Sequence, residues 1–390
     1  MGFSIVLPFL AVYLKSGRHI AATSIGAVYT LSGVIGALTQ LVAGELADRY
    51  GRRSLMVSSL LVRSGILAAM GFAIVHDASF ATLGVLVVAN ATVRSLFEPA
   101  AFAAVTDVTT IEQRVAAFGV QRIGINVGWA AGPALGGYLA KIGYGYLFFL
   151  AVPATLLAAF LCVGMKDLRA PRGAQERFSL RDIATLRQDR HLLPFLGVTL
   201  VGMILVAQIF SPFAMYASDK LHLDAIKLGH LYSINGLLVA GLQVPAVWLI
   251  GRLGQRRAVL LGPLAYAIAY TCVGFARAMP GLILCVVFLT LAEVVLMPAQ
   301  QSIASRLGDA SRQGRVMGLY GLTFAAGMSF GPLVGGLAVD HLIRWPLVMW
   351  GSLGLLGVIS SIGYAVVLRH TVTDGRAKVA RSSSQARISS

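Results

Sequence analysis

Long apolar runs separated by short polar turns occupy most of the chain. Each run has close to the roughly 20 residues that a helix needs to cross a membrane. Eleven such runs lie at residues 20–42, 54–75, 80–105, 115–139, 145–165, 191–218, 228–250, 257–276, 281–305, 315–339 and 345–368. Together with an opening run, the pattern predicts an all-α membrane protein with twelve transmembrane helices.

The second half of the chain repeats the first. Residues Tyr29, Ser32, Gly33 and Gln40 meet Tyr232, Asn235, Gly236 and Gln243 at a constant offset of 203. At an offset of 199, Gly119, Gly128, Gly132, Pro133, Gly136 and Gly137 recur as Gly318, Gly327, Gly331, Pro332, Gly335 and Gly336. The repeat predicts two six-helix bundles, at residues 1–165 and 191–368.

The opening run is short for a spanning helix. Met1 to Leu14 would reach about 21 Å at about 1.5 Å per residue, less than the roughly 30 Å hydrocarbon core. In the repeat, Tyr13 corresponds to Tyr216. Helix seven begins near His191, far ahead of Tyr216, so the apolar run before Tyr13 is shorter than its counterpart. The mismatch predicts that a functional polypeptide has about ten to twenty more apolar residues before Met1.

Composition agrees with a membrane protein and charge sets its orientation. Hydrophobic residues make up 57% of the chain, charged residues 12%, and the net charge is +16. Most Lys and Arg residues lie in the turns on one side, which predicts that both termini face the cytoplasm and argues against nucleic acid as a partner. The three cysteines lie in apolar runs and indicate no disulfide.

Two segments lie outside the predicted bundles. Residues 166–190 are rich in arginine, and Ser179 and Asp182 have the spacing of a capping box, which predicts a short amphipathic helix on the cytoplasmic surface. Residues 369–390 are basic and rich in serine, which predicts a disordered cytoplasmic tail.

The turn after the second apolar run is basic and rich in glycine. It reads Gly44-Glu-Leu-Ala-Asp48-Arg49-Tyr-Gly51-Arg52-Arg53. Its partial copy in the second half reads Gly251-Arg252-Leu-Gly254-Gln255-Arg256-Arg257, with Gly251 in place of Asp48. Twelve spans, a duplicated six-helix unit and this turn resemble the major facilitator superfamily and its motif A. The glycines and Pro133 of helix five are similar to a motif of the superfamily's drug:proton antiporters, although Val87 stands where these antiporters have an arginine early in helix four.

The resemblance implies a fold of two pseudo-symmetric bundles with a gate on the cytoplasmic side. It places Asp48 at the N-terminus of helix eleven, where the helix dipole favours a carboxylate, and Arg52 within reach of Asp107. Because the second copy lacks the acid, the gate is predicted to be asymmetric. For Arg53 and Arg257, a solvated turn without a gating role is the alternative. The repeated glycines and Pro133 and Pro332 imply a close contact between helices at which the two halves can rock.

Charged residues inside spans are costly in hydrocarbon and therefore indicate function. The chain has Arg63, Arg94, Glu98, Arg122 and Glu293 at such positions. Arg94 and Glu98 lie one helical turn apart and either face a cavity or form a structural pair that neutralises itself. Arg63 is predicted to be a packing or snorkelling residue.

The two intramembrane carboxyls have different neighbours along the chain. Glu98 has Arg94 one turn away, so it is expected to stay ionised and to act as an electrostatic anchor. Glu293 has Leu289 and Met297 at the same spacing, so it is the predicted proton carrier. The alternative for Glu293 is a neutral carboxyl that is hydrogen-bonded to Gln300 or to a neighbouring helix.

The resemblance implies that helices one, four, seven and ten line a central cavity. The predicted lining comprises Arg94, Arg122, Asn126, Gln208, Phe213, Tyr216, Asn235, Gln243, Met297 and Gln300. This mixture of aromatic, amide and methionine side chains favours lipophilic or amphiphilic molecules, cationic ones included, over sugars or phosphates.

The sequence thus predicts a monomeric secondary transporter of the inner membrane that exports small molecules in exchange for protons by alternating access. It has no nucleotide-binding loop, metal-ligand cluster or nucleophile–base pattern, so neither a cofactor nor an enzymatic activity is expected. The alternatives are export of a lipid or a native metabolite, proton-coupled uptake, and a membrane sensor that does not transport.

Overall fold

A computed structural model of the chain describes residues 7–165, 192–307 and 313–388. All regular structure within these residues is helical. Nine helices of the described part are long and apolar enough to cross a membrane. The predicted amphipathic helix of residues 166–190 lies outside the described residues.

The helices of the first half, called the N-half, follow the predicted spans one to six. A short opening helix ends in a π-helical turn, and five long helices follow. They are α1 (Leu7–Val12) with its turn η1 (Tyr13–Gly17), α2 (Ala22–Tyr50), α3 (Arg52–Val75), α4 (Phe80–Asp107), α5 (Ile111–Ile142) and α6 (Tyr144–Val163).

The helices of the second half, called the C-half, follow spans seven to twelve, but span seven is broken. They are α8 (Leu192–Val206), the 3-10 turn η2 (Ala207–Ile209), α9 (Ser211–Asp219), α10 (Ala225–Leu253), α11 (Gln255–Val273), α12 (Met279–Ala304), α13 (Gln313–Leu342) and α14 (Pro346–Ile388). Pro212 at the start of α9 has no backbone donor, which explains the break. The Tyr232 hydroxyl donates to the carbonyls of Ile209 (2.7 Å) and Phe210 (2.6 Å) at this point.

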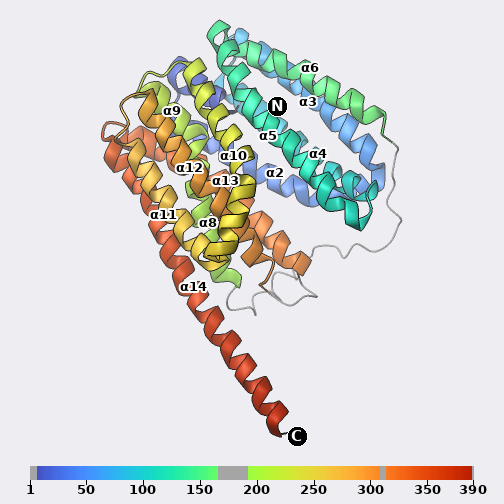
Figure 1. Ribbon diagram of the computed structural model, residues 1–390. Coiled ribbons are helices and arrows are strands. Elements are labelled where there is room, and N and C mark those ends of the chain that lie inside the picture. The colour runs from blue at the N-terminus through green and yellow to red at the C-terminus, as the bar shows by residue number, and fades with distance from the viewer. Residues whose placement is uncertain (1–6, 166–191, 308–312, 389–390) are drawn as a thin grey trace.

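The two halves form separate groups of helices that meet mainly along three helix pairs (Figure 1). Within the N-half, α2 packs on α4, and α3 packs on α4 and α6. Within the C-half, α10 packs on α12, and α11 packs on α12 and α14. Contacts between the halves join α2 to α13, α5 to α10 and α1 to α9. The two-bundle architecture predicted from the repeat is confirmed.

The last helix does not end where the last apolar run ends. α14 continues to Ile388 and projects away from the bundle (Figure 1). The sequence analysis predicted a disordered tail at residues 369–390, whereas the structure describes residues 369–388 as part of α14. No proline follows Pro346, and alanine, lysine and arginine residues support a continued helix.

Candidate functional site

Two helix pairs, α2 with α13 and α5 with α10, form matching seams between the halves. A side chain at Gly26 of α2 would collide with the Pro332 carbonyl of α13, and one at Gly229 of α10 would collide with the Pro133 carbonyl of α5. These two contacts are repeat counterparts, since Gly26 and Gly229 differ by 203 positions and Pro133 and Pro332 by 199. The repeated prolines and glycines thus lie at close backbone contacts, as small residues do in membrane helix pairs.

The seams close only one end of the molecule. Contacts at glycines lie near the start of α2 and of α10. Farther along, no heavy atom lies within 4 Å of where a side chain would begin at Gly44, Gly119, Gly124, Gly241, Gly251 and Gly321, within the part of the chain that the structure describes. The halves are therefore joined at the end where α2 begins, called the Asp340 end, and separated toward the end where α2 meets α3, called the motif A end.

The motif A turn is built around a glycine and a buried arginine. Gly51 has φ +89°, and its counterpart Gly254 has φ +82°, so both turns need a residue without a side chain. Arg52 is buried, ion-pairs with Asp107 and donates to the Ala103 carbonyl at 3.0 Å. The predicted contact between Arg52 and Asp107 is thus present. The Asp48 side chain and the start of α13 that it was expected to meet lie outside the described side chains.

The remaining motif A positions are more open. Arg49 lies over the ring of Tyr50 with 5.4 Å from its guanidinium carbon to the ring centroid. In the second copy, Arg252 lies over Trp248 at 3.6 Å, and Gln255, the counterpart of Arg52, donates to Ser302 at 2.6 Å. Among the described side chains, the first turn is tied to α4 by an ion pair and a hydrogen bond, and the second is tied to α12 by a hydrogen bond between uncharged side chains.

Asp340 closes the opposite end by binding the other half. Its carboxylate, near the end of α13, accepts from the backbone N–H groups of Ala22 (2.9 Å) and Thr23 (2.8 Å) at the start of α2. Lys15 donates to the same carboxylate at 2.9 Å. We call these three contacts the Asp340 clasp. A carboxylate at a helix N-terminus satisfies free N–H groups and is favoured by the helix dipole.

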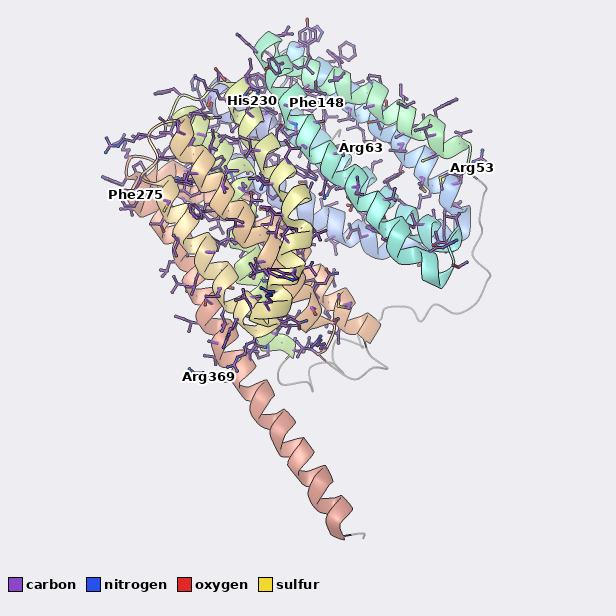
Figure 2. The ribbon with its side chains drawn as sticks, viewed as in Figure 1. Arg53, Arg63, Phe148, His230, Phe275 and Arg369 are labelled. Carbon is purple, nitrogen blue, oxygen red and sulfur yellow. The ribbon has the colours of Figure 1, made fainter. Side chains whose placement is uncertain are left out.

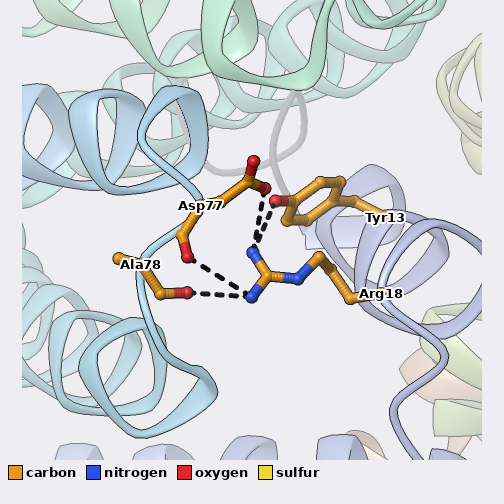
Figure 3. Close-up of polar contacts among 4 residues, drawn as sticks. All are labelled: Tyr13, Arg18, Asp77 and Ala78. Carbon is orange, nitrogen blue, oxygen red and sulfur yellow. Dashed lines mark hydrogen bonds and ion pairs between the residues drawn. The ribbon is translucent and has the colours of Figure 1, made fainter.

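Arg18 fixes the same region to the N-half (Figure 3). It donates to the Tyr13 hydroxyl at 3.2 Å, to the Asp77 carboxylate at 3.2 Å and to the Ala78 carbonyl at 3.2 Å. The hydrogen bond to Tyr13 raises the pKa of Arg18. The sequence analysis missed Asp340, Lys15 and Arg18. The available signal was the repeat itself, in which Asp340 falls on Lys141.

The N-half carries a polar cluster that joins three of its helices. Arg63 of α3 donates from Nε to the Asn90 amide oxygen at 3.1 Å. Arg94 lies 3.7 Å from the Glu98 carboxylate, and Gln40 of α2 donates to Glu98 at 3.3 Å. Arg63, labelled in Figure 2, is half-buried and bonds to α4, so it packs against that helix. The side chain of Arg122 lies outside the description, and Asn126 is half-buried on α5.

The C-half places Glu293 at the corresponding position. Arg94 and Glu293 differ by 199 positions, the offset of the repeat. Asn235 of α10 donates to Thr290 at 2.9 Å and to the Glu293 carboxylate at 3.4 Å. Glu293 is half-buried and therefore lies against a neighbouring helix, whereas Gln300 donates to the Tyr364 hydroxyl at 2.8 Å instead. Gln243 and Met297 are also half-buried.

Four residues predicted to line the cavity lie in the core of the C-half instead. Gln208, Phe213, Tyr216 and Gln300 are fully or almost fully buried. Gln208 donates to the carbonyls of Ile204 (2.6 Å) and Gly331 (3.0 Å), and Tyr216 packs edge-on against Trp350. The break in span seven lies beside Gln208, Phe213 and Tyr216, whereas Gln300 lies on α12. All four side chains pack against neighbouring helices, so in this conformation they do not reach open space.

A match to a family profile identifies the family of this chain. The profile described as Major Facilitator Superfamily matches residues 1–249 and 196–388. The chain belongs to the Major Facilitator Superfamily. Members of the superfamily are multi-pass membrane transporters of small molecules, so the superfamily predicted from the sequence is confirmed.

Relatives and solved structures agree with this membership. The chain is 29% identical to the uncharacterized MFS-type transporter YqjV of Bacillus subtilis, over 87% of this chain and 83% of the relative. It is 24% identical to multidrug resistance protein 2 of Bacillus subtilis, over 97% and 94%. The crystal structure of nucleoside transporter NupG superposes with a TM-score of 0.78 at 13% identity, over 94% of this chain and 95% of that one. The structural likeness shows the superfamily fold.

Proposed function

We propose that this superfamily member exports lipophilic or amphiphilic small molecules in exchange for protons, by alternating access. Glu293 carries the proposal. It is a half-buried carboxyl within a span, and it accepts a hydrogen bond from Asn235 of α10, a helix that also contacts the other half. A carboxyl at such a position can exchange a proton with water in one conformation and hold it in the other.

The conformation of the seams supports alternating access. The halves are joined at the Asp340 end and separated toward the motif A end. This arrangement is one of the two that a rocking transporter needs around a central site. The positive charge of the motif A turn supports placing that end in the cytoplasm, so the conformation described is open inward.

The choice of substrate class rests on the half-buried residues beside Glu293 and on relatives. Asn235, Gln243 and Met297 offer amide and thioether groups with little charge, which suits lipophilic compounds. Multidrug resistance protein 2 of Bacillus subtilis and multidrug resistance protein MdtH of Cronobacter sakazakii match this chain over 97% and 92% of its length. Their names support export of drug-like molecules.

The test uses purified protein in vesicles that contain a pH-sensitive dye. Addition of tetraphenylphosphonium, a lipophilic cation, should drive proton movement with the parent protein and should not do so with Glu293→Gln. Glu98→Gln is the matched control, because it removes the other carboxyl within a span. If Glu293→Gln moves protons as fast as the parent, the carrier lies elsewhere and Glu98 becomes the next candidate.

Direction is measured separately with dye accumulation in cells that express or lack the protein. Less accumulation with the protein supports export. More accumulation supports proton-coupled uptake, and no difference favours a lipid or a native metabolite as substrate.

A further inference from the structure

A groove lies between the ends of α3 and α6 at the motif A end of the N-half. Its volume is about 360 Å³, and it is lined by one cation, two hydroxyls and three apolar side chains: Arg53, Ser54, Ser58, Val57, Leu61 and Val163. α3 packs on α4 and α6 of its own half, and Figure 2 shows Arg53 on the side of the N-half that faces away from the C-half. The groove therefore faces the surroundings of the molecule and not the space between the halves.

The lining of the groove changes from polar to apolar along α3. Arg53, Val57 and Leu61 are four residues apart, so they form one row along the helix. Ser54 and Ser58 form the row beside it. Leu61 lies about 12 Å farther along the helix axis than Arg53, since each residue adds about 1.5 Å. The headgroup layer of a bilayer is about 5–8 Å thick on each side, so an arginine at headgroup level places Leu61 among acyl chains.

Both the apolar and the polar part of the groove are open to a ligand. The Leu61 side chain is 51% exposed, and Ser54 is exposed as well. Arg53 is half-buried, and its guanidinium forms no ion pair or hydrogen bond with a residue that the structure describes. Ser58 donates to the Leu55 carbonyl of its own helix at 3.2 Å. The donors that can bind a ligand are therefore the guanidinium of Arg53 and the hydroxyl of Ser54.

Charge favours an anionic lipid over the nearest segment of the chain as the occupant of the groove. The description of the N-half ends at Met165, two residues after Val163. Residues 166–191, which follow, have seven Lys and Arg residues against four Asp and Glu residues, so like charge disfavours their binding beside Arg53. Anionic phospholipids carry the opposite charge and attract basic residues at the ends of spans.

We propose that the groove binds one anionic phospholipid of the cytoplasmic leaflet, with its phosphate at Arg53 and Ser54 and an acyl chain along the apolar side chains. A guanidinium and a hydroxyl both donate to phosphate oxygens, and the charge-assisted hydrogen bonds of arginine are the stronger ones. The leaflet follows from the orientation proposed above, whereas the site itself uses none of the groups proposed to carry protons. The lipid contacts α3 and α6 together, next to the turn that Arg52 holds against α4.

Quenching of a fluorophore beside the groove measures which lipid occupies it. Val62→Cys, next to Leu61 on α3, takes a bimane label in a chain whose three native cysteines are replaced by alanine. In vesicles, phosphatidylglycerol with brominated acyl chains should occupy the groove about fivefold more readily than brominated phosphatidylcholine, as expected for one arginine near an anionic headgroup. Arg53→Gln should remove this preference, whereas Arg53→Lys should keep most of it.

Arg256→Gln on α11 is the matched control. Arg256 is the repeat counterpart of Arg53, but Leu261 stands at the position that corresponds to Ser58, so the second copy lacks this hydroxyl. The lipid preference measured at Val62 should not change in this variant.

A variant that fills the groove separates a built site from surface charge. Ser58→Phe leaves Arg53 in place and should still remove the preference. The lipid site is ruled out if the preference survives Arg53→Gln or Ser58→Phe, or if Arg256→Gln abolishes it, because each result assigns the preference to surface charge in general. Loss of the preference in inorganic phosphate would assign the site to a free anion. Equal quenching by both lipids in the labelled parent chain would also contradict the lipid site, and it is the result expected if residues 166–191 fill the groove.

Discussion

The two seams between the halves share a glycine–proline contact and differ in the charged residues at their ends. In both, a glycine at the start of one helix meets a proline carbonyl of the other. At the Asp340 end, α2 has Ala21 as its N-cap residue and receives the carboxylate of Asp340 from the other half. At the matching point, α10 is capped by its own Asp224, which accepts from Lys227 N–H at 2.8 Å. Lys141, the counterpart of Asp340, is exposed.

The difference teaches which seam can act as a switch. The α2–α13 seam has an ionic contact between the halves at one end, and at the other end it carries Asp48, which is predicted to bind the start of α13. The α5–α10 seam has Lys141 and Gly251 at these positions. We therefore expect the α2–α13 seam to set the balance between the two conformations, and the α5–α10 seam to serve as a passive hinge.

The largest effect is expected where the seams are alike. Gly26→Leu and Gly229→Leu each place a side chain against a proline carbonyl and should cost about 1–3 kcal/mol in the conformation closed at the Asp340 end. Both should lower transport in vesicles and increase labelling of single cysteines at that end. Gly251→Leu, where open space adjoins the glycine, is the control. Unequal effects of the two leucine variants would contradict the equivalence of the seams.

Asp340→Asn should produce the next largest shift, and only in one seam. The substitution removes the ion pair with Lys15 and the charge at the start of α2, together worth about 1–2 kcal/mol. Cysteine labelling at the Asp340 end should rise several-fold. Lys141→Met changes the repeat counterpart and should leave labelling unchanged. A similar response to both variants would remove the distinction between the seams.

Asp48→Asn should shift the balance in the opposite direction. Loss of a carboxylate near a helix N-terminus costs a few tenths to about 2 kcal/mol, and the conformation closed at the motif A end should lose that amount. The counterpart change Gly251→Asp should do far less. Asp340 stabilises closure at one end and Asp48 is predicted to stabilise closure at the other. Cysteine labelling of the double variant of Asp48 and Asp340 should therefore be closer to that of the parent than labelling of either single variant.

The smallest effect on the balance between the two conformations is expected at Asp224, which caps α10 of its own half. Asp224→Ala should lower the free energy of unfolding by about 0.5–2 kcal/mol, because α10 loses a hydrogen bond to its first turn. Labelling at both ends should not change. Ala21→Asp gives α2 the kind of cap that α10 has, and in the Asp340→Asn background it should restore stability but not closure. Restored closure would mean that capping alone, without a link between the halves, explains the clasp.

The sequence predicted the spans, the repeat and the ion pair of Arg52 with Asp107, because each is written in a local pattern or a motif. It failed for Gln208, which lies at the break in span seven, and for Gln300 on α12, because both are held by partners distant in the chain, Gly331 and Tyr364. It also missed Asp340, because an acid at a helix end is common and its partners are backbone N–H groups, which no residue type reveals. The mismatch between Asp340 and Lys141 was the one visible sign.

The single clasp carries information about the history of the chain. In a dimer of two identical subunits, every substitution appears twice, so an acid on one helix and a missing cap on its partner would create two clasps. One clasp can exist only where the two copies mutate separately. The exchange of Asp340 against Lys141, and of Ala21 against Asp224, therefore needs two copies that can change independently, as the two halves of this chain can. A single chain with two copies has a freedom that a symmetric dimer lacks: one seam can gain a contact that the other does not have.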